Sequence, residues 1–169
     1  CPYGQAFSVS KAWTGVIKMR FPLDLDYEEW LTLCMEEWHE PPFRADQICG
    51  WFYERRTFSF EEMTNLSKEL RRKASETFGP AVPKIEKVEV SKRDGTQKIL
   101  WSLRDGESVE SVLLEQDGRK TACISTQVGC PLACSFCATG QSGFVRNISC
   151  GEIVGQFIAM EKDKRSLSD

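Results

Sequence analysis

Histidine, long apolar runs and excess positive charge are all scarce in this sequence. A single His stands among 169 residues, so catalysis must rely on thiols, carboxylates or a cofactor rather than on imidazole. No run approaches the roughly 18 consecutive apolar residues of a membrane span, which excludes a transmembrane protein. The formal net charge of −3 excludes a generally polycationic nucleic-acid binder and leaves local basic patches for such contacts.

Cysteine is present, but below the density of a disulfide scaffold. Three of the eight cysteines fall within Cys130–Cys137, and such clustering favours metal ligation in a reducing compartment. Cys34 and Cys49 lie on apolar helix faces and are expected in the core, whereas Cys150 is expected to have no special role. No secretory signal pattern is visible at the N-terminus, and the chain begins at Cys1 rather than Met. We therefore expect a cytoplasmic protein, or an organellar one whose targeting segment was removed before Cys1.

The first half of the chain is predicted to be a lead-in followed by short helices. Residues 1–23 show no period and are interpreted as a linker, and residues 24–79 as a small helical domain. Asp26 and Glu29 form a D-x-x-E capping box, and Ser67 is a candidate N-cap. Apolar spacing predicts four helices, which run from Asp26 to Trp38, from about Arg44 to Arg55, over Phe60–Met63 and from Ser67 to Phe78.

From residue 80 the apolar period changes to two. Three Asp-Gly steps, at Asp94, Asp105 and Asp117, separate β-rich runs and are typical of an antiparallel meander over residues 80–118. Residues 119–169 are interpreted as one strand–loop–helix unit, with its parts at Thr121–Ser125, 126–144 and Glu152–Lys162. The predicted fold class is therefore α+β to α/β: a small helical domain, a β meander and the first unit of a strand–helix array.

One segment has a pattern that predicts chemistry. Cys130, Cys134 and Cys137 form C-x3-C-x2-C, which places three thiolates on one tight loop. Three such ligands can hold three irons of a four-iron cluster and leave the fourth iron open to a substrate or cofactor. Zinc is the alternative, because Cys123 or Cys150 could complete a set of four ligands. The spacing favours the iron–sulfur cluster over zinc.

Several strings around this loop narrow the interpretation. They are Cys123 to Cys130 (CISTQVGC), Ala138-Thr139-Gly140, Gly143-Phe144 with Arg146-Asn147, Glu152 to Gln156 (EIVGQ), Pro42 to Ile48 (PFRADQI) and Phe60 to Thr64 (FEEMT). Together they resemble the RlmN/Cfr group of radical S-adenosylmethionine (SAM) methyltransferases, which act on adenine in ribosomal RNA. The resemblance covers about residues 25–160. It implies a [4Fe–4S] cluster on the three loop cysteines, SAM as cofactor, 23S rRNA and also tRNA as substrates, an electron donor of the flavodoxin type, and no membrane.

The resemblance also implies roles outside the loop. Cys123 matches the family's second, non-cluster cysteine, which resolves a protein–RNA adduct, and Glu110 matches a carboxylate that can act as base at adenine C2. From the residues alone, Cys123 would be a buried strand cysteine and Glu110 a solvated strand residue. Residues 119–169 would open a truncated radical-SAM (β/α) partial barrel. The helical domain would bind RNA through two basic runs, Arg55-Arg56 and Arg71-Arg72-Lys73.

Two parts of the family's machinery have no match in these 169 residues. They are the Gly-Glu-Pro-type strand end that binds SAM and the C-terminal cysteine that carries the methyl group. We therefore expect the chain by itself to bind iron poorly and to transfer no methyl group, as the N-terminal part of such an enzyme. The alternative is a catalytically inactive RNA-binding module with a zinc or vestigial metal site. His39, between a helix and two prolines, is expected at the surface.

Overall fold

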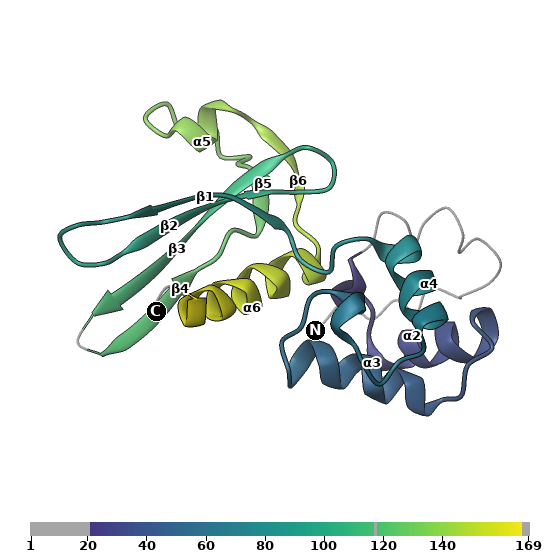
Figure 1. Ribbon diagram of the computed structural model, residues 1–169. Helices are drawn as coiled ribbons and strands as arrows, with labels where there is room; N and C mark the ends of the chain where they lie inside the picture. The colour runs from purple at the N-terminus through teal and green to yellow at the C-terminus, as the bar shows by residue number, and fades with distance from the viewer. Residues whose placement is uncertain (1–20, 117, 167–169) are drawn as a thin grey trace.

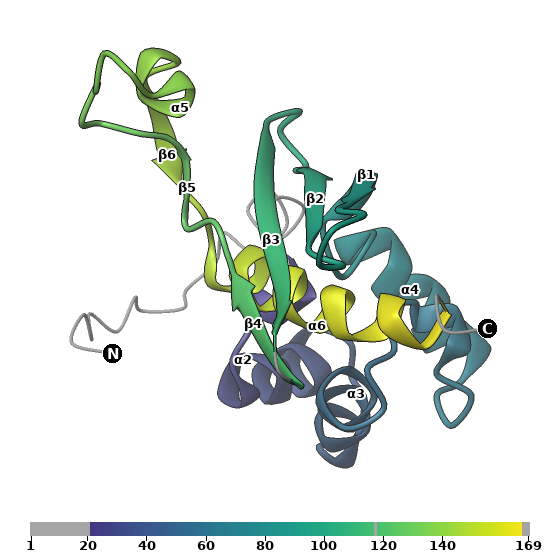
Figure 2. The same ribbon diagram turned by 90° about the vertical axis from the view of Figure 1, so that its left-hand side faces the viewer.

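Helices and a sheet occupy different sides of the molecule. The computed structural model describes residues 21–116 and 118–166. Short helices of the first part lie beside a four-stranded sheet, and the long helix α6 (Cys150–Ser166) runs along one face of that sheet (Figure 1). A hairpin with a short helix at its tip projects beyond the sheet (Figure 2). Within the described ranges, every helix is too short or too polar to cross a membrane.

The helical part consists of short elements. They are η2 (Pro22–Asp24), α2 (Tyr27–Thr32), the π-helical turn η3 (Leu33–Glu37), α3 (Phe43–Tyr53), η4 (Phe60–Glu62) and α4 (Lys68–Phe78). Of these, α2, η4 and α4 begin at a side-chain N-cap. Asp26 Oδ1 accepts from the Glu29 amide at 2.8 Å, and Ser67 Oγ accepts from the Leu70 amide at 3.1 Å. Both predicted caps are thus confirmed, and each helix bound predicted for this part of the chain lies within two residues of the observed one.

Aromatic side chains fill the centre of the helical part. Trp30 is buried, and its ring lies 5.1 Å from that of Phe78 and 6.1 Å from that of Phe52. Pairs at these separations add about 0.5–1.5 kcal/mol each beyond the burial of their area. Leu23 packs into the same core and Phe21 is buried, although both belong to the predicted lead-in. Residues 1–20 of that lead-in lie outside the described residues.

The predicted meander is confirmed as an antiparallel sheet, but it has one strand more than predicted, because the strand assigned to the following strand–loop–helix unit pairs antiparallel with the last meander strand. Its strands, in spatial order, are β1 (Lys84–Val90), β2 (Gln97–Ser102), β3 (Ser108–Gln116) and β4 (Arg119–Cys123). Alternation along the strands gives the sheet two different faces. Ile99, Trp101 and Val109 point to the face that α6 covers and are buried there. The residues between them point to the opposite face.

The segment after β4 differs from the prediction. Residues 126–144, predicted as a loop, contain strand β5 (Gln127–Gly129) and helix α5 (Ala138–Gln141), and strand β6 (Phe144–Asn147) begins at the end of that range. β5 and β6 pair antiparallel. Strands of three and four residues are too short to show a period of two, which explains the error. The strand predicted at Thr121–Ser125 is β4, two residues earlier, and α6 begins two residues before the predicted Glu152.

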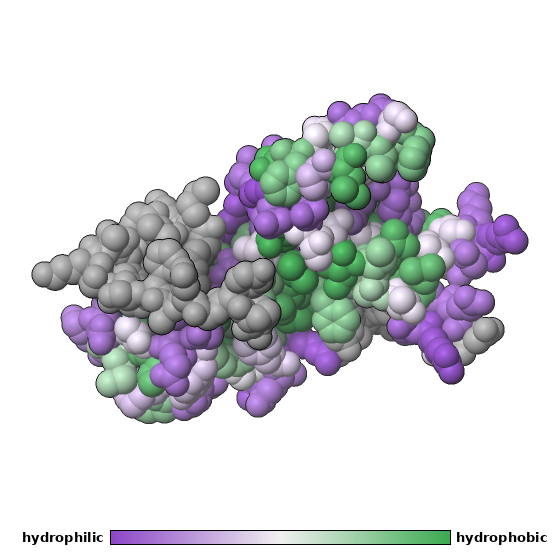
Figure 3. All heavy atoms as spheres, turned by 180° about the vertical axis from the view of Figure 1, so that it is seen from behind, coloured by the Kyte–Doolittle hydropathy of each residue, from purple (hydrophilic) through white to green (hydrophobic). Residues whose placement is uncertain are grey.

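The molecule has two hydrophobic clusters, one inside the helical part and one against the sheet, and helix α6 contacts both. Ile158 packs into the helical core, whereas Ala159 and Met160 pack against the sheet. Gly155 faces the segment that precedes β1, and a Cβ there would lie only 2.8 Å from Pro83 Cδ. The absence of a side chain therefore lets the linker and the helix approach closely. Apolar residues gather at the middle of the molecule's rear face and again at the projecting tip (Figure 3).

Candidate functional site

The three cysteines of the C-x3-C-x2-C pattern lie on the loop between β5 and α5. Their thiols are free and the residues are partly exposed. The Cys137 amide donates to the Cys134 carbonyl at 3.1 Å, which closes a turn within the loop. The apolar side chains of Leu132 and Phe136 between them are 77% and 89% exposed. The loop thus presents thiols and apolar groups together at the tip of the hairpin.

The donor set fits an iron–sulfur cluster in its chemistry, because three free thiols share one loop. Their present arrangement is not that of a bound metal. Across residues 21–116 and 118–166, no three Cys, His, Asp or Glu side chains are grouped so that they could hold a metal ion. Cys123 and Cys150, the candidates for a fourth zinc ligand, are both exposed, at the end of β4 and the start of α6. The ligand roles of the loop cysteines therefore stay predictions.

The backbone at the root of the loop requires glycine. Gly129, the last residue of β5, has a φ of 73°, and a Cβ there would lie 1.8 Å from the Gly143 carbonyl oxygen. That oxygen accepts from the Cys130 amide at 2.9 Å. At the tip, a Cβ on Gly140 would lie 2.9 Å from the Cys134 amide nitrogen, so α5 packs directly on the loop backbone. Close backbone contacts at both ends therefore shape the loop that carries the thiols.

Glu110 and Cys123 lie on the same face of the sheet, the one turned away from α6. Cys123 pairs with Val112 across β3 and β4, and residues two apart on a strand point the same way. Glu110 and Cys123 are therefore diagonal neighbours. Both are exposed, so the interpretation of Cys123 as a buried strand cysteine is wrong. Their neighbours Val109 and Ser111 point to α6 instead and are buried.

Lys98, which no sequence pattern singled out, contacts Glu110 on this face. Its Nζ lies 3.1 Å from Glu110 Oε1 and 3.3 Å from Glu89 Oε2. Hydrogen bonds to Glu110 and then to Glu89 raise the pKa of Lys98. Lys87 adds a further ion pair to Glu89 at 2.6 Å, so alternating charges cross β1, β2 and β3. Exposed pairs stabilise a fold only slightly, so the main effect of this line is to orient the Glu110 carboxylate.

A groove of 560 Å³ connects Glu110 with the hairpin. Its sheet side is formed mainly by Leu100, Gly106, Glu107, Ser108, Val109 and Glu110, and its hairpin side by Gln127, Val128, Gly129, Ala138, Thr139, Ser142, Gly143 and Val145, with Ser125 between them. Ser125 Oγ donates to the Glu110 carbonyl at 2.5 Å, which joins the two sides. Hydroxyl, amide and carboxylate groups lie beside apolar side chains along its walls, so the groove offers polar partners as well as apolar contacts. Of the predicted site residues, Glu110 lines this groove, and Cys130 directly follows its lining residue Gly129.

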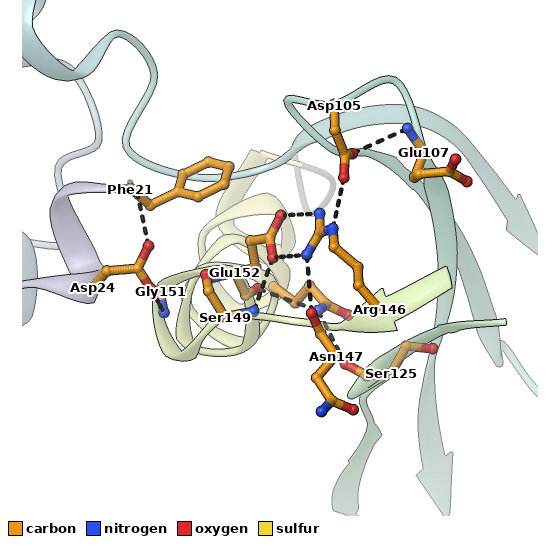
Figure 4. Close-up of polar contacts among 11 residues, drawn as sticks. Phe21, Asp24, Asp105, Glu107, Ser125, Arg146, Asn147, Ser149, Gly151 and Glu152 are labelled. Atoms are coloured by element: carbon orange, nitrogen blue, oxygen red, sulfur yellow. Dashed lines mark hydrogen bonds and ion pairs between the residues drawn. The ribbon is translucent and has the colours of Figure 1, made fainter. Parts of the chain in front are cut away.

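An ion cluster with one buried member, Glu152, lies at the base of the hairpin. Arg146 of β6 makes two hydrogen bonds to the buried Glu152 carboxylate, at 2.8 and 2.9 Å, and its Nε donates to Asp105 Oδ2 at 2.6 Å (Figure 4). The hydrogen bonds to Glu152 and Asp105 raise the pKa of Arg146, and the one from Arg146 lowers the pKa of Asp105. Sequence patterns had indicated no role for Arg146 or Glu152. A local sequence signal for Glu152 exists, because Ser149 and Glu152 match an S-x-x-E capping box, and both hydrogen bonds of that box are present.

The other residues that the sequence singled out have structural or surface positions. Cys34 is fully buried, and burial is the main cause that raises the pKa of its thiol to about 11. Cys49 is partly buried against the same core, and burial raises the pKa of its thiol as well. His39 and Cys150 are exposed. The expected core positions of Cys34 and Cys49 and the expected surface position of His39 are confirmed.

The basic runs of the helical part are engaged within the fold to different degrees. Arg55 stacks over the Trp51 ring at 4.3 Å, and Arg72 forms an exposed pair with Glu76 at 2.9 Å. Beside α4 lies a groove of 480 Å³, lined by Glu61, Lys68, Arg71, Arg72, Ser75 and Glu76. Three basic groups against two carboxylates leave this groove with a net positive charge.

Comparison with known proteins places these features in a family. Residues 23–78 match the family described as the ribosomal RNA large subunit methyltransferase N-terminal domain. A probable dual-specificity RNA methyltransferase RlmN from Petrotoga mobilis is 56% identical over 142 residues, which are 84% of this chain and 41% of that protein. A second, from Thermosipho melanesiensis, is 52% identical over 147 residues, 87% of this chain and 43% of that protein.

A solved structure supports the same relationship. The crystal structure of a radical SAM methyltransferase from Sphaerobacter thermophilus matches with a TM-score of 0.77 and 36% identity, over 88% of this chain and 43% of that one. The chain thus spans about two fifths of the length of the curated relatives it matches. The matches agree with the resemblance that the cysteine loop and its neighbouring strings indicate. Residues 23–78 thus match the N-terminal domain of the ribosomal RNA large subunit methyltransferase family, and more than four fifths of the chain is similar to RlmN-type RNA methyltransferases.

Proposed function

We propose that the protein to which this chain belongs methylates C2 of adenine in 23S rRNA and in tRNA, with SAM and a [4Fe–4S] cluster. The observation that carries the proposal is the C-x3-C-x2-C loop at the edge of a groove that contains Glu110, in a fold similar to that of a radical SAM methyltransferase. The description of the relatives as dual-specificity RNA methyltransferases supports two classes of RNA substrate.

Cys130, Cys134 and Cys137 would hold the cluster as thiolates. When bound, a cluster with one open iron supplies a binding site for SAM and the electron that cleaves it. The chain's own contribution is to hold three free, partly exposed thiols close in sequence on a loop that a paired hairpin carries. Because the loop lies outside both hydrophobic clusters, its thiols can rearrange around a metal without disturbing the core.

Glu110 and Cys123 would act on the RNA from one face of the sheet. A carboxylate beside the target ring can accept the proton that leaves C2, and a thiolate can resolve a covalent adduct between protein and RNA. As diagonal neighbours on adjacent strands, the two groups can reach the same base. Lys98 supports this arrangement by position, because its Nζ lies 3.1 Å from Glu110 Oε1 and holds the carboxylate on the exposed face.

RNA would contact the helical part through its phosphates. The groove beside α4 offers Lys68, Arg71 and Arg72 for such contacts, and each phosphate neutralised there releases counterions. An electron donor of the flavodoxin type and a cytoplasmic location, or an organellar one, complete the proposal. The helical part would then hold the RNA while the sheet and the cysteine loop perform the chemistry.

Cluster loading is tested with the protein encoded by the open reading frame that contains this chain. After anaerobic reconstitution with iron and sulfide, we expect a brown protein that absorbs at about 400 nm. Cys130→Ala should abolish the absorbance, whereas Cys150→Ala, a matched change at an exposed cysteine outside the loop, should keep it. One zinc per chain and no colour would instead support the inactive RNA-binding module.

Methyl transfer is tested on unmodified 23S rRNA and tRNA transcripts with methyl-labelled SAM and a reductant. Nucleoside mass spectrometry should detect 2-methyladenosine, and Glu110→Gln should lose this product while it keeps the cluster. A label at C8 would correct the target carbon, and a fully loaded protein that labels neither RNA would refute the proposed activity. The 169-residue chain alone is expected to transfer no methyl group.

A further inference from the structure

The hairpin that carries the cysteine loop extends away from the sheet. β5 and β6 form a two-stranded sheet of their own beside the four-stranded one (Figure 2). Their lengths are three and four residues, and an isolated two-stranded hairpin is marginally stable at best. Contacts beyond strand pairing must therefore fix the position of the loop.

Helix α6 holds the segment that enters the hairpin. Gln156 is fully buried, and its Nε2 donates at 3.2 Å to the carbonyl of Ser125, which lies two residues before β5. Its Oε1 accepts from Ser111 Oγ of β3 at 2.5 Å. Both ends of this amide are therefore hydrogen-bonded. The entering segment is tied to the helix and, through the same side chain, to the sheet.

The same helix holds the strand that leaves the hairpin. Glu152 lies one turn before Gln156 and takes two parallel hydrogen bonds from Arg146 of β6 (Figure 4). The remaining guanidinium nitrogen of Arg146, Nε, donates to Asp105 Oδ2 in the turn between β2 and β3. Glu152 is only 3% exposed and also accepts from the Ser149 amide at 2.9 Å. A planar guanidinium held in this way fixes direction as well as distance, which an ammonium group does not.

We infer that Arg146 is a positioning residue for the cysteine loop and acts through Glu152 and Asp105. The inference rests on the proposed function, because the loop matters as the holder of a cluster. Side chains four apart on a helix share a face, so Glu152 and Gln156 hold strand β6 and the segment before β5 against the same side of α6. Arg146 lies three residues after Gly143, whose carbonyl receives the hydrogen bond of the first cysteine of the loop. A shift of its guanidinium would therefore move the root of the loop.

Amide hydrogen exchange tests this in the protein encoded by the open reading frame that contains the chain, before any cluster is added. In Arg146→Met we expect the amides of Cys130 and Gly143 to exchange about tenfold faster, while those of α3 and α4 keep their wild-type rates. Asp105→Asn keeps the buried Glu152 paired, so it should fold normally and raise the exchange about threefold.

Arg72→Met is the matched control. It makes the same chemical change and breaks the exposed pair with Glu76 on α4, so exchange in the loop should not change. Equal loop exchange in Arg146→Met and Arg72→Met would overturn the inference. So would an equal rise in α3 and α4, because that would mean a general loss of stability rather than a displaced loop.

Cluster retention gives a second readout. With a chelator present, the absorbance near 400 nm should decay about tenfold faster in Arg146→Met than in the wild type. Arg146→Lys should be intermediate, because it restores the charge without the two parallel hydrogen bonds. A wild-type rate in Arg146→Met would count against the positioning role. If the wild-type protein takes up no cluster while the exchange results hold, the proposed function fails and the positioning of the loop by Arg146 still stands.

Discussion

Alanine at Gly129 should disrupt the root of the cysteine loop far more than alanine at Gly143. Gly129 is paired with Phe144, the residue after Gly143, and the two glycines have nearly equal φ, 73° and 76°. Their surroundings differ, however. A Cβ on Gly143 would meet nothing within 4 Å, whereas a Cβ on Gly129 would lie 1.8 Å from the Gly143 carbonyl oxygen. The pair therefore separates the cost of positive φ from the cost of the clash.

The magnitudes follow from these contacts. Positive φ costs an alanine about 1–2 kcal/mol, and this is the whole expected effect of Gly143→Ala. In Gly129→Ala the strands must also separate to relieve the clash. This movement breaks the hydrogen bond from the Cys130 amide to Gly143, which adds about 0.5–1.5 kcal/mol, and it loosens the packing around Val128. The first two contributions sum to about 1.5–3.5 kcal/mol, and with the loosened packing we expect about 3 kcal/mol in total for Gly129→Ala.

Amide exchange of residues in β5 and β6 measures this local opening free energy directly. Gly143→Ala should increase exchange about tenfold and Gly129→Ala more than about a hundredfold, with unchanged exchange in the helical core. Gly129→Ala should also fail to retain a cluster under conditions in which Gly143→Ala retains it. Equal exchange in the two variants would refute the close approach of the strands at Gly129.

Two further predictions concern the cysteines and the ion cluster. Iodoacetamide at about pH 8 should modify the exposed Cys123 and Cys150 rapidly. It should spare Cys34 until urea unfolds the helical part, because burial raises the pKa of the Cys34 thiol to about 11. Peptide mass spectrometry measures the order of labelling, and early labelling of Cys34 would show that the prediction is wrong. The hydrogen bond from Arg146 lowers the pKa of Asp105 in the folded protein. The stability that this ion pair contributes is therefore complete above the unfolded pKa of about 3.9 and is lost as pH falls through the lower folded pKa. The protection factors of β6 amides should therefore drop in strong acid in the wild type, and a drop of the same size in Asp105→Asn would contradict this account.

The elements predicted correctly are those whose signals are local in sequence. The capping box of Asp26 and Glu29 and the N-cap Ser67 satisfy amides within the same helical turn, so their positions can be read from neighbouring residues. The meander was predicted because its connections carry Asp-Gly steps between alternating runs. Both kinds of signal concern contacts between residues a few positions apart, which no later part of the fold overrides.

The features that were missed depend on contacts between distant residues. Asp105 and Arg146 are 41 positions apart and meet only because the turn after β2 and the strand β6 both reach the start of α6. Lys98 meets Glu110 through the register of β2 and β3. The hairpin was missed for a different reason, since its strands are too short to establish a period. The candidate roles of Glu110 and Cys123 came from the resemblance, and alternation alone could not show which face α6 would cover.

The buried face of the sheet determines where the chemical groups lie. Because side chains alternate with a period of two, a slip of β3 by one residue would turn Glu110 toward α6 and move Val109 and Ser111 into water. Such a slip would break the hydrogen bond between Ser111 and Gln156 and unpack Trp101, which is fully buried opposite Val109. Exposing one large apolar side chain costs about 1.5–3 kcal/mol, so the register is strongly favoured. Residues that take no part in the proposed reaction therefore keep its carboxylate on the open face.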